Sequence, residues 1–403
     1  MKKIFALLLA AALVFTLAAC AAPEAAPDPE PAPAEEAPAD DPDPEPEDVD
    51  EAPEEPEEAG DADAGHMRVA LVAHSPDSIL DDGSFNQGAW DGIQRFLTSH
   101  GLSGDHAQFF QPHEADDESR LDLVAQAISE FGATVIVLPG FDFATSSTMM
   151  QEAFPDVHFI LLDTSPRTPD FEPADILSNL VAVHYAEEQA GFLAGYAAVM
   201  EGYTELGFVG GRAVPAVVRF GHGFLQGAEH AGESLGLGAG DITINHYYVG
   251  GFAPDPGVAT LASAWYADGI EVIFAAAGGA GFSVMSGAEA SGGAVIGVDV
   301  DQSGDSDTVI TSAIKALNVS VYDLLTDVLN GQFRGGVEVI FDAAVNGIGL
   351  TMDTARFENF TAAQYEAIFA LLADGTIVVD AVITETPTEA GLDLSVVNLV
   401  DLN

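Results

Sequence analysis

An aromatic ring and an amide stand side by side in residues 84–87, Ser-Phe-Asn-Gln. This run follows the apolar, strand-like residues 68–73 and precedes residues 88–96, whose amphipathic pattern predicts a helix. In an open α/β sheet, the loop at the carboxyl end of the first strand commonly carries ligand-binding residues. Phe85 could stack there on a flat ring while Asn86 bonds to the edge of that ring. The run therefore predicts a site for a planar ligand, unless Phe85 is a core aromatic beside a turn.

Two acids stand at the ends of later strand-like runs. Asp163 follows the apolar residues 159–162, and Asp299 follows residues 295–298. A carboxylate at the carboxyl end of a parallel strand points into the crevice where such sheets bind ligands, and it can accept N–H or O–H donors. Asp163 could instead cap a helix or form a turn. We prefer Asp299 to Asp301 as a ligand-binding residue, because Asp299 is nearer the strand end.

One lysine stands out in a chain that has almost none. Lys315 is the only lysine beyond residue 3, although the chain has 65 Asp and Glu residues. It could donate to a ligand oxygen and pair with Asp299, or it could be an ordinary surface lysine.

A glycine pair marks another candidate turn. Gly278 and Gly279 follow the strand-like residues 272–274, where glycines would let backbone N–H groups approach a ligand closely. The turn lacks the Gly-x-Gly-x-x-Gly spacing of dinucleotide sites.

Strand-like and helix-like segments alternate from residue 67 onward. Near-continuous apolar strands separated by helices predict parallel sheets covered on both faces, an α/β fold. The 337 residues from 67 to 403 suit two domains. The predicted strands are 69–72, 135–138, 159–162, 206–209, 272–275, 295–298 and 309–313, and the predicted helices include 119–131, 186–201, 220–230, 257–268 and 319–329.

The first 66 residues have a different character. A basic start, a short apolar run and small residues before Cys20 predict a signal peptide over residues 1–19. Leu-Ala-Ala-Cys resembles the bacterial lipobox, which implies lipidation of Cys20; the alternative is an ordinary signal with a chance cysteine. Residues 21–66 hold 19 acids, 11 prolines and no Lys or Arg, so residues 20–66 are expected to be a disordered tether. Because Cys20 is the only cysteine, the folded part has no disulfide or thiol nucleophile.

The charge balance limits the partners. Residues 67–403 carry 46 Asp and Glu against 9 Lys and Arg. Binding to a nucleic-acid backbone is therefore excluded as a function, and so is adhesion to an anionic membrane by charge alone. Self-repulsion of this size is screened by salt, so we infer a halophilic protein whose fold depends on salt.

Together these motifs resemble the basic membrane protein (BMP) family over about residues 67–350. Its members are substrate-binding lipoproteins of ABC importers, and several bind purine nucleosides. The resemblance implies the type I periplasmic-binding-protein fold, with two Rossmann-like lobes, a hinge and an interlobe cleft. It places lobe 1 at 67–184 with 316–338, and lobe 2 at 185–315 with 339–403.

The resemblance also implies roles for single residues. Residues 247–252 are similar to the family segment whose aromatic closes on the base from the second lobe, so Phe252 would face Phe85. Core packing is the alternative role for Phe252. Asp163 would accept from a purine N–H edge, and Gly278 and Gly279 would form the ribose-side turn. Asp299 and Lys315 would bond to the ribose.

The chain departs from the family at one position near the site. The family usually has aspartate just after the first strand, where this chain has His74. His74 could bond to the base or the sugar in its place, which would make binding sensitive to pH near neutrality, or it could be a loop residue.

These observations favour a binding protein over an enzyme. The chain has no His-Glu-x-x-His, Gly-x-Ser-x-Gly or Walker motif, and no cofactor or metal is expected. The expected partners are a nucleoside, an ABC permease and its ATPase, and the membrane through a lipid anchor on the extracytoplasmic face. The open alternatives are another planar ligand such as riboflavin or a nucleobase, a sugar, or a role as surface sensor or adhesin. A phosphorylated nucleotide is disfavoured, because the expected cleft has one cation against several acids.

Overall fold

The computed structural model describes residues 64–384 and 386–403. The predicted signal peptide, Cys20 and the predicted tether up to residue 63 lie outside the described residues. Within those ranges, none of the helices is both long enough and apolar enough to cross a bilayer.

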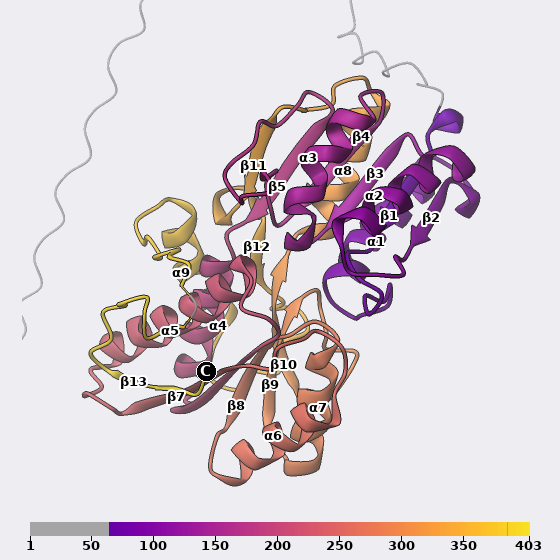
Figure 1. Ribbon diagram of the computed structural model, residues 1–403. Coiled ribbons are helices and arrows are strands. Elements are labelled where there is room, and N and C mark those ends of the chain that lie inside the picture. The colour runs from indigo at the N-terminus through magenta and orange to yellow at the C-terminus, as the bar shows by residue number, and fades with distance from the viewer. Residues whose placement is uncertain (1–63, 385) are drawn as a thin grey trace, which may run out of the picture. The chain divides into compact units, whose positions relative to one another are not determined.

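The strands of the described residues form two sheets (Figure 1). The first has the order β11-β5-β4-β3-β1-β2, and all of its neighbours are parallel. Its central strands are fully buried, as in β1, because helices cover both faces. The bounds are β1 (Val69–Val72), β2 (Ala107–Phe110), β3 (Val135–Pro139), β4 (His158–Leu162), β5 (Leu180–Tyr185) and β11 (Val337–Phe341).

The second sheet has the order β12-β10-β9-β8-β6-β7-β13. Its neighbours are parallel except for β12, which runs antiparallel to β10. The bounds are β6 (Glu205–Gly210), β7 (Ile242–Tyr248), β8 (Val272–Ala276), β9 (Ala294–Asp299), β10 (Val309–Lys315), β12 (Ile348–Leu350) and β13 (Val397–Asp401).

Figure 1 shows α1, α2, α3 and α8 around the first sheet and α6 and α7 against the second. The longer helices are α1 (Phe85–Ser99), α2 (Asp117–Gln126), α3 (Ala144–Ala153), α4 (Glu187–Glu201), α5 (Pro215–Leu235), α6 (Pro256–Ala267), α7 (Ala280–Ser291), α8 (Leu317–Leu329) and α9 (Ala362–Ala373). Short helices are η1 (Ala64–His66), η2 (Gly104–His106), η3 (Ala127–Phe131), η4 (Phe141–Phe143) and η5 (Ala343–Val345).

We call the first sheet with its helices lobe 1 and the second sheet with its helices lobe 2. The chain passes between the sheets after Tyr185, after Lys315 and after Phe341. β11 pairs with β5 along its whole length up to Phe341, so the last crossing follows Phe341, close to the boundary of about 338 that the resemblance implies. The other lobe boundaries remain a proposal.

Close helix contacts fix the elements beside these crossings. Gly88 and Gly92 of α1 leave no room for a Cβ against Leu317 and Val321, so α8 packs tightly on lobe 1 directly after the crossing at Lys315. The helix α4, which begins directly after the crossing at Tyr185, packs on α5 in the same manner.

Glycines of both helices form the α4–α5 contact. Gly191 and Gly195 lie against the backbone carbonyls of Phe220 and Phe224 in α5, while Gly223 lies against Glu188 of α4. Gly221 differs, because it faces the sheet residues Phe208 and His246. The contact is therefore mainly helix on helix.

Candidate functional site

A cavity of about 660 Å³ lies between the carboxyl ends of the strands of the two lobes. All nine residues predicted to bind a ligand contribute to its lining. They are His74, Phe85, Asn86, Asp163, Phe252, Gly278, Gly279, Asp299 and Lys315. Parallel strands end at one edge of their sheet, so residues distant in sequence meet there.

The strand order gives this cavity two ends. One end, which we call the hinge end, lies at the strands from which the chain crosses, β5 and β10. There Asp163 follows β4, Asp299 ends β9 and Lys315 ends β10. At the far end lie side chains that follow strands deeper in each sheet, namely His74 after β1, Asp142 after β3, Arg212 after β6 and Phe252 after β7.

Phe85 and Asn86 lie in the first turn of α1, and the prediction that they belong to a loop is wrong. The cause is Asp82, whose carboxylate accepts from the backbone N–H groups of Ser84 (3.0 Å), Asn86 (3.1 Å) and Gln87 (3.0 Å). Satisfying these free donors starts the helix one turn earlier than the apolar pattern indicates. Phe85 is half-buried and lines the cavity.

Two buried oxygen atoms at the site have no donor among the described residues, Asn86 Oδ1 and Asp163 Oδ1. The Asn86 amide nitrogen donates to the Ile79 carbonyl (3.1 Å) and to Asp82 (3.0 Å), which fixes its oxygen as the free atom. A buried acceptor without a donor costs stability. The site is therefore suited to a ligand that presents N–H groups.

Lys315 is buried and joins carboxylates from both lobes. Its Nζ lies 2.6 Å from Asp163 Oδ2, 3.3 Å from Glu187 Oε1 and 3.7 Å from Asp299 Oδ1. The predicted pairing with Asp299 is thus the longest of the three. Burial opposes the ammonium, but these carboxylates outweigh it and raise the pKa of Lys315, so it stays charged.

Burial raises the pKa of Asp163 and of Asp299, because it disfavours the charged carboxylate. The nearby Lys315 ammonium lowers both pKa values but only partly offsets the effect of burial. Asp299 also accepts from the Ser84 hydroxyl at 2.5 Å. Glu187 differs, because Arg219 and Lys315 outweigh its burial and lower its pKa. Arg219 binds Glu187 at 2.7 Å and does not line the cavity.

Both strand-end acids have an unusual backbone. Asp163 has φ of 63° and Asp299 has φ of 66°, in the left-handed region that few residues other than glycine adopt. Such strain is typically held at ligand-binding positions by the surrounding fold. Asp301, by contrast, accepts from Ser303 N and Thr354 Oγ1 in an exposed turn, in keeping with the preference for Asp299.

The glycine pair supports the loop that carries Phe252. A Cβ on Gly279 would meet the Phe252 carbonyl at 3.1 Å, and one on Gly278, whose φ is 55°, would meet the Phe252 side chain at 3.4 Å. The Phe252 carbonyl also accepts from Ala280 N at 2.8 Å. The pair therefore brings the turn after β8 close to this aromatic.

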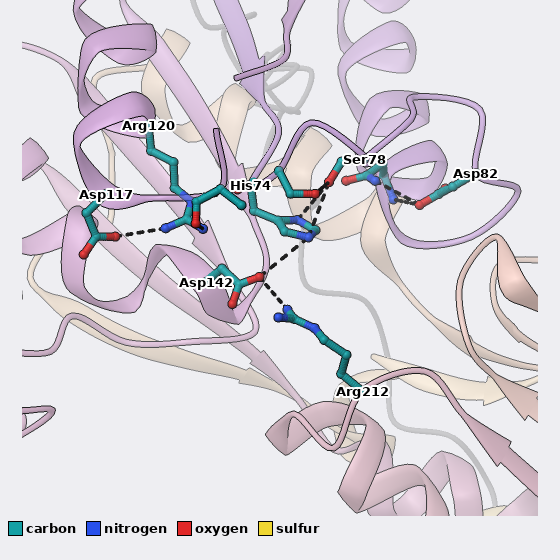
Figure 2. A network of polar contacts seen from close by, with 10 residues as sticks. His74, Ser78, Asp82, Asp117, Arg120, Asp142 and Arg212 are labelled. Carbon is teal, nitrogen blue, oxygen red and sulfur yellow. Dashed lines mark hydrogen bonds and ion pairs between the residues drawn. The ribbon is translucent and has the colours of Figure 1, made fainter. Parts of the chain in front are cut away.

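Figure 2 shows the polar contacts at the far end of the cavity. His74 lies 3.2 Å from the Ser78 hydroxyl and 3.7 Å from Asp142 Oδ2. Burial lowers the pKa of His74, against the attraction of Asp142. The ring is therefore neutral at pH 7, and its titration moves to more acidic pH than first expected.

The cavity is also lined by two arginines that the sequence did not predict, Arg120 and Arg212. Arg212 stands two residues after β6, so the strand-end rule that found Asp163 could have found it. The expectation of a single cation is therefore wrong. Arg120 donates to the carbonyls of His74 and Ala115 and to Asp117, while Arg212 binds Asp142. All three Arg120 nitrogens are therefore engaged, whereas Arg212 uses Nη2 alone.

No group of three or more His, Cys, Asp or Glu residues in the described ranges could hold a metal ion.

The sequence matches a protein family and is similar to several known proteins. A family model described as "ABC transporter substrate-binding protein PnrA-like" matches residues 68–372. The chain is 28% identical over 312 residues to the ABC transporter nucleoside-binding protein BmpA of Lactococcus lactis, covering 72% of this chain and 83% of that one. It is 30% identical over 276 residues to basic membrane protein A1 of Borrelia garinii, covering 67% and 75%.

Solved structures bear on the fold. A solute-binding protein of Aeropyrum pernix matches with a TM-score of 0.61 at 23% identity, covering 78% of this chain and 88% of that one. One from Conexibacter woesei matches with a TM-score of 0.61 at 22% identity, covering 78% and 99%. The predicted two-lobed α/β fold is confirmed. The chain belongs to the Bmp family of PnrA-like ABC transporter substrate-binding proteins, which are not enzymes.

Proposed function

We propose that this protein binds a nucleoside, with a purine as the favoured base, and delivers it to the permease and ATPase of an ABC importer. The base would stack on Phe85 and Phe252, which line the cavity from opposite lobes. The protein would act on the extracytoplasmic face of the membrane, anchored through lipidated Cys20. The relative named as a nucleoside-binding protein supports this proposal.

The observation that carries the choice of ligand is the pair of free acceptors beside Phe85. Asn86 Oδ1 and Asp163 Oδ1 are buried and lack donors among the described residues. Guanine, hypoxanthine and adenine all present N–H groups on the edge of a flat ring, so they can satisfy these oxygens while stacking. A sugar alone would leave the aromatic walls without a matching surface.

Lys315 and Asp299 complete the proposed site at the hinge end. Asp299 Oδ1 lies 3.7 Å from Lys315 Nζ, beyond hydrogen-bond distance, so this oxygen can accept from a ribose hydroxyl. The Lys315 ammonium can donate to a ribose oxygen from the same end. Carboxylate and ammonium together suit a vicinal diol.

A thermal-shift screen in high salt tests the ligand. Inosine, guanosine and adenosine are expected to raise the melting temperature, because a ligand that binds only the folded state stabilises it. Ribose is expected to give no shift. A response to riboflavin or a free sugar, with none to any nucleoside, would keep the fold and overturn the ligand. A functional sensor or adhesin would show the same binding without any uptake defect on deletion.

Replacing Asp299 by Asn tests the ribose role. We expect Asp299→Asn to weaken binding of inosine about tenfold or more and binding of hypoxanthine far less, because only the riboside presents hydroxyls to Asp299 Oδ1. Calorimetric titration of both ligands measures the difference. Asp301→Asn, in an exposed turn nearby, is the matched control and should change neither affinity. Equal losses for inosine and hypoxanthine would remove Asp299 from the ribose site.

A further inference from the structure

An ion pair joins the two lobes at the end of the cavity away from the hinge. Arg212 Nη2 of lobe 2 lies 2.5 Å from Asp142 Oδ2 of lobe 1, and Figure 2 shows the two side chains pointing toward each other. Their side chains are 40% and 21% exposed, respectively, so the pair is partly shielded from water. Neither residue belongs to the proposed base or ribose contacts.

The strand order places this ion pair far from the chain crossings between the lobes. Asp142 follows β3, two strands from β5, and Arg212 follows β6, three strands from β10. At about 4.8 Å per strand, the pair stands about 10 Å and 14 Å along the two sheets from the crossings. A hinge rotation displaces atoms in proportion to their distance from the hinge, so opening separates this pair further than Lys315 and Asp163.

Arg212 also lies beside Phe252, an aromatic residue of lobe 2 that lines the cavity. Its guanidinium lies 5.5 Å from the centre of the Phe252 ring, and the neighbouring Gly211 has no room for a Cβ because that ring packs on it. Backbone bonds from Val249 N to Gly210 O and from Gly250 N to Gly211 O, each 2.9 Å, join the two loops. The loops that carry Arg212 and Phe252 therefore move as one piece.

We propose that Arg212 and Asp142 form an interlobe clasp that holds the cavity closed and positions Phe252 against the bound ligand. Arg212 draws the Phe252 loop toward lobe 1, and Asp142 is the anchor on lobe 1. The clasp slows ligand release without touching the ligand. Closure by the clasp is independent of ligand identity; only the release experiment rests on the proposed nucleoside function.

Interlobe distances test the clasp directly. The full-length chain with Cys20→Ser carries spin labels at Met149→Cys in α3 and Ala264→Cys in α6, both exposed. Pulsed dipolar spectroscopy at fixed salt, with and without inosine, gives the distance distribution. Arg212→Gln and Asp142→Asn should each enlarge the long-distance population, and the double variant should be no more open than either single variant. Fully additive shifts, or distributions identical to the parent, would overturn the clasp.

The experiment also includes a matched control variant and the rate of inosine dissociation. Arg334→Gln removes an arginine whose ion pair with Asp327 lies within lobe 1, so it should leave the distances unchanged. Arg212→Gln should speed inosine dissociation about two- to fivefold, in the range for a partly exposed ion pair. If inosine fails to bind the parent protein, the nucleoside proposal fails, while the distances still decide the clasp.

Discussion

Lys315→Met is expected to destabilise the protein by about 3–5 kcal/mol and to remove measurable nucleoside binding. The methionine would fill the space of the lysine stem, but it would leave Asp163, Glu187 and Asp299 buried without their shared cation. Removing one partner from a buried charge cluster costs far more than removing a surface pair, because the remaining charges stay desolvated. Urea unfolding at constant high salt measures the loss.

The pH dependence identifies the cause of that loss. Burial already raises the pKa of Asp163 and Asp299, and the variant removes the cation that opposes this rise. A carboxyl whose folded-state pKa is raised binds protons more readily in the folded state, so its contribution is favourable at low pH and is lost as pH rises. Lys315→Met should therefore lower the free energy of unfolding less at pH 5 than at pH 8.

Arg334→Met is the matched control, because Arg334 forms a partly exposed ion pair with Asp327. It should lower the free energy of unfolding by at most about 1 kcal/mol.

Gly227→Ala is expected to destabilise the fold by about 3 kcal/mol. Gly227 lies where α5 crosses α4, and a Cβ there would overlap the Phe192 carbonyl of α4. Backbone cannot rotate away as a side chain can, so the two helices would have to separate. This strain exceeds the roughly 1 kcal/mol that alanine gains over glycine in a helix.

Gly281→Ala in α7 is the matched control. Its Cβ would meet Ala275 at the ordinary contact distances of 3.8 and 4.0 Å. Urea unfolding should show this variant to be as stable as the parent or more so. If Gly227→Ala were equally harmless, α4 and α5 would not be in the close contact described, and the position of Glu187 at the start of α4 would need another support.

The sequence predicts the central strands well because they are covered on both faces. β1, β3, β4, β6, β8, β9 and β10 all appear as continuous apolar runs. β5 has the same apolar character, and the same rule could predict it. β2, β7 and β13 are less completely buried, and each includes several partly buried residues. Their position depends on pairing with distant strands, which local pattern does not specify.

The residues of the candidate site also fall into two groups, those that can be predicted from the sequence and those that cannot. Residues that directly follow an apolar strand, such as Asp163 and Asp299, can be placed from the sequence, since strand ends meet at one edge of a sheet. Glu187 and Arg120 could not be placed in this way. They lie in the first turns of α4 and α2, whose positions depend on tertiary packing, so no local pattern distinguishes them from the many other charged residues.

The burial of Lys315 has a practical consequence for chemical modification. The folded domain carries no other lysine, and the Lys315 side chain is 2% exposed. Reagents that acylate amines would find no ε-amino group on the surface of the closed domain. Modification of Lys315 would occur only when the lobes part or the chain unfolds. The rate of acylation at Lys315, read by mass spectrometry, would therefore report how often the cavity opens or the chain unfolds.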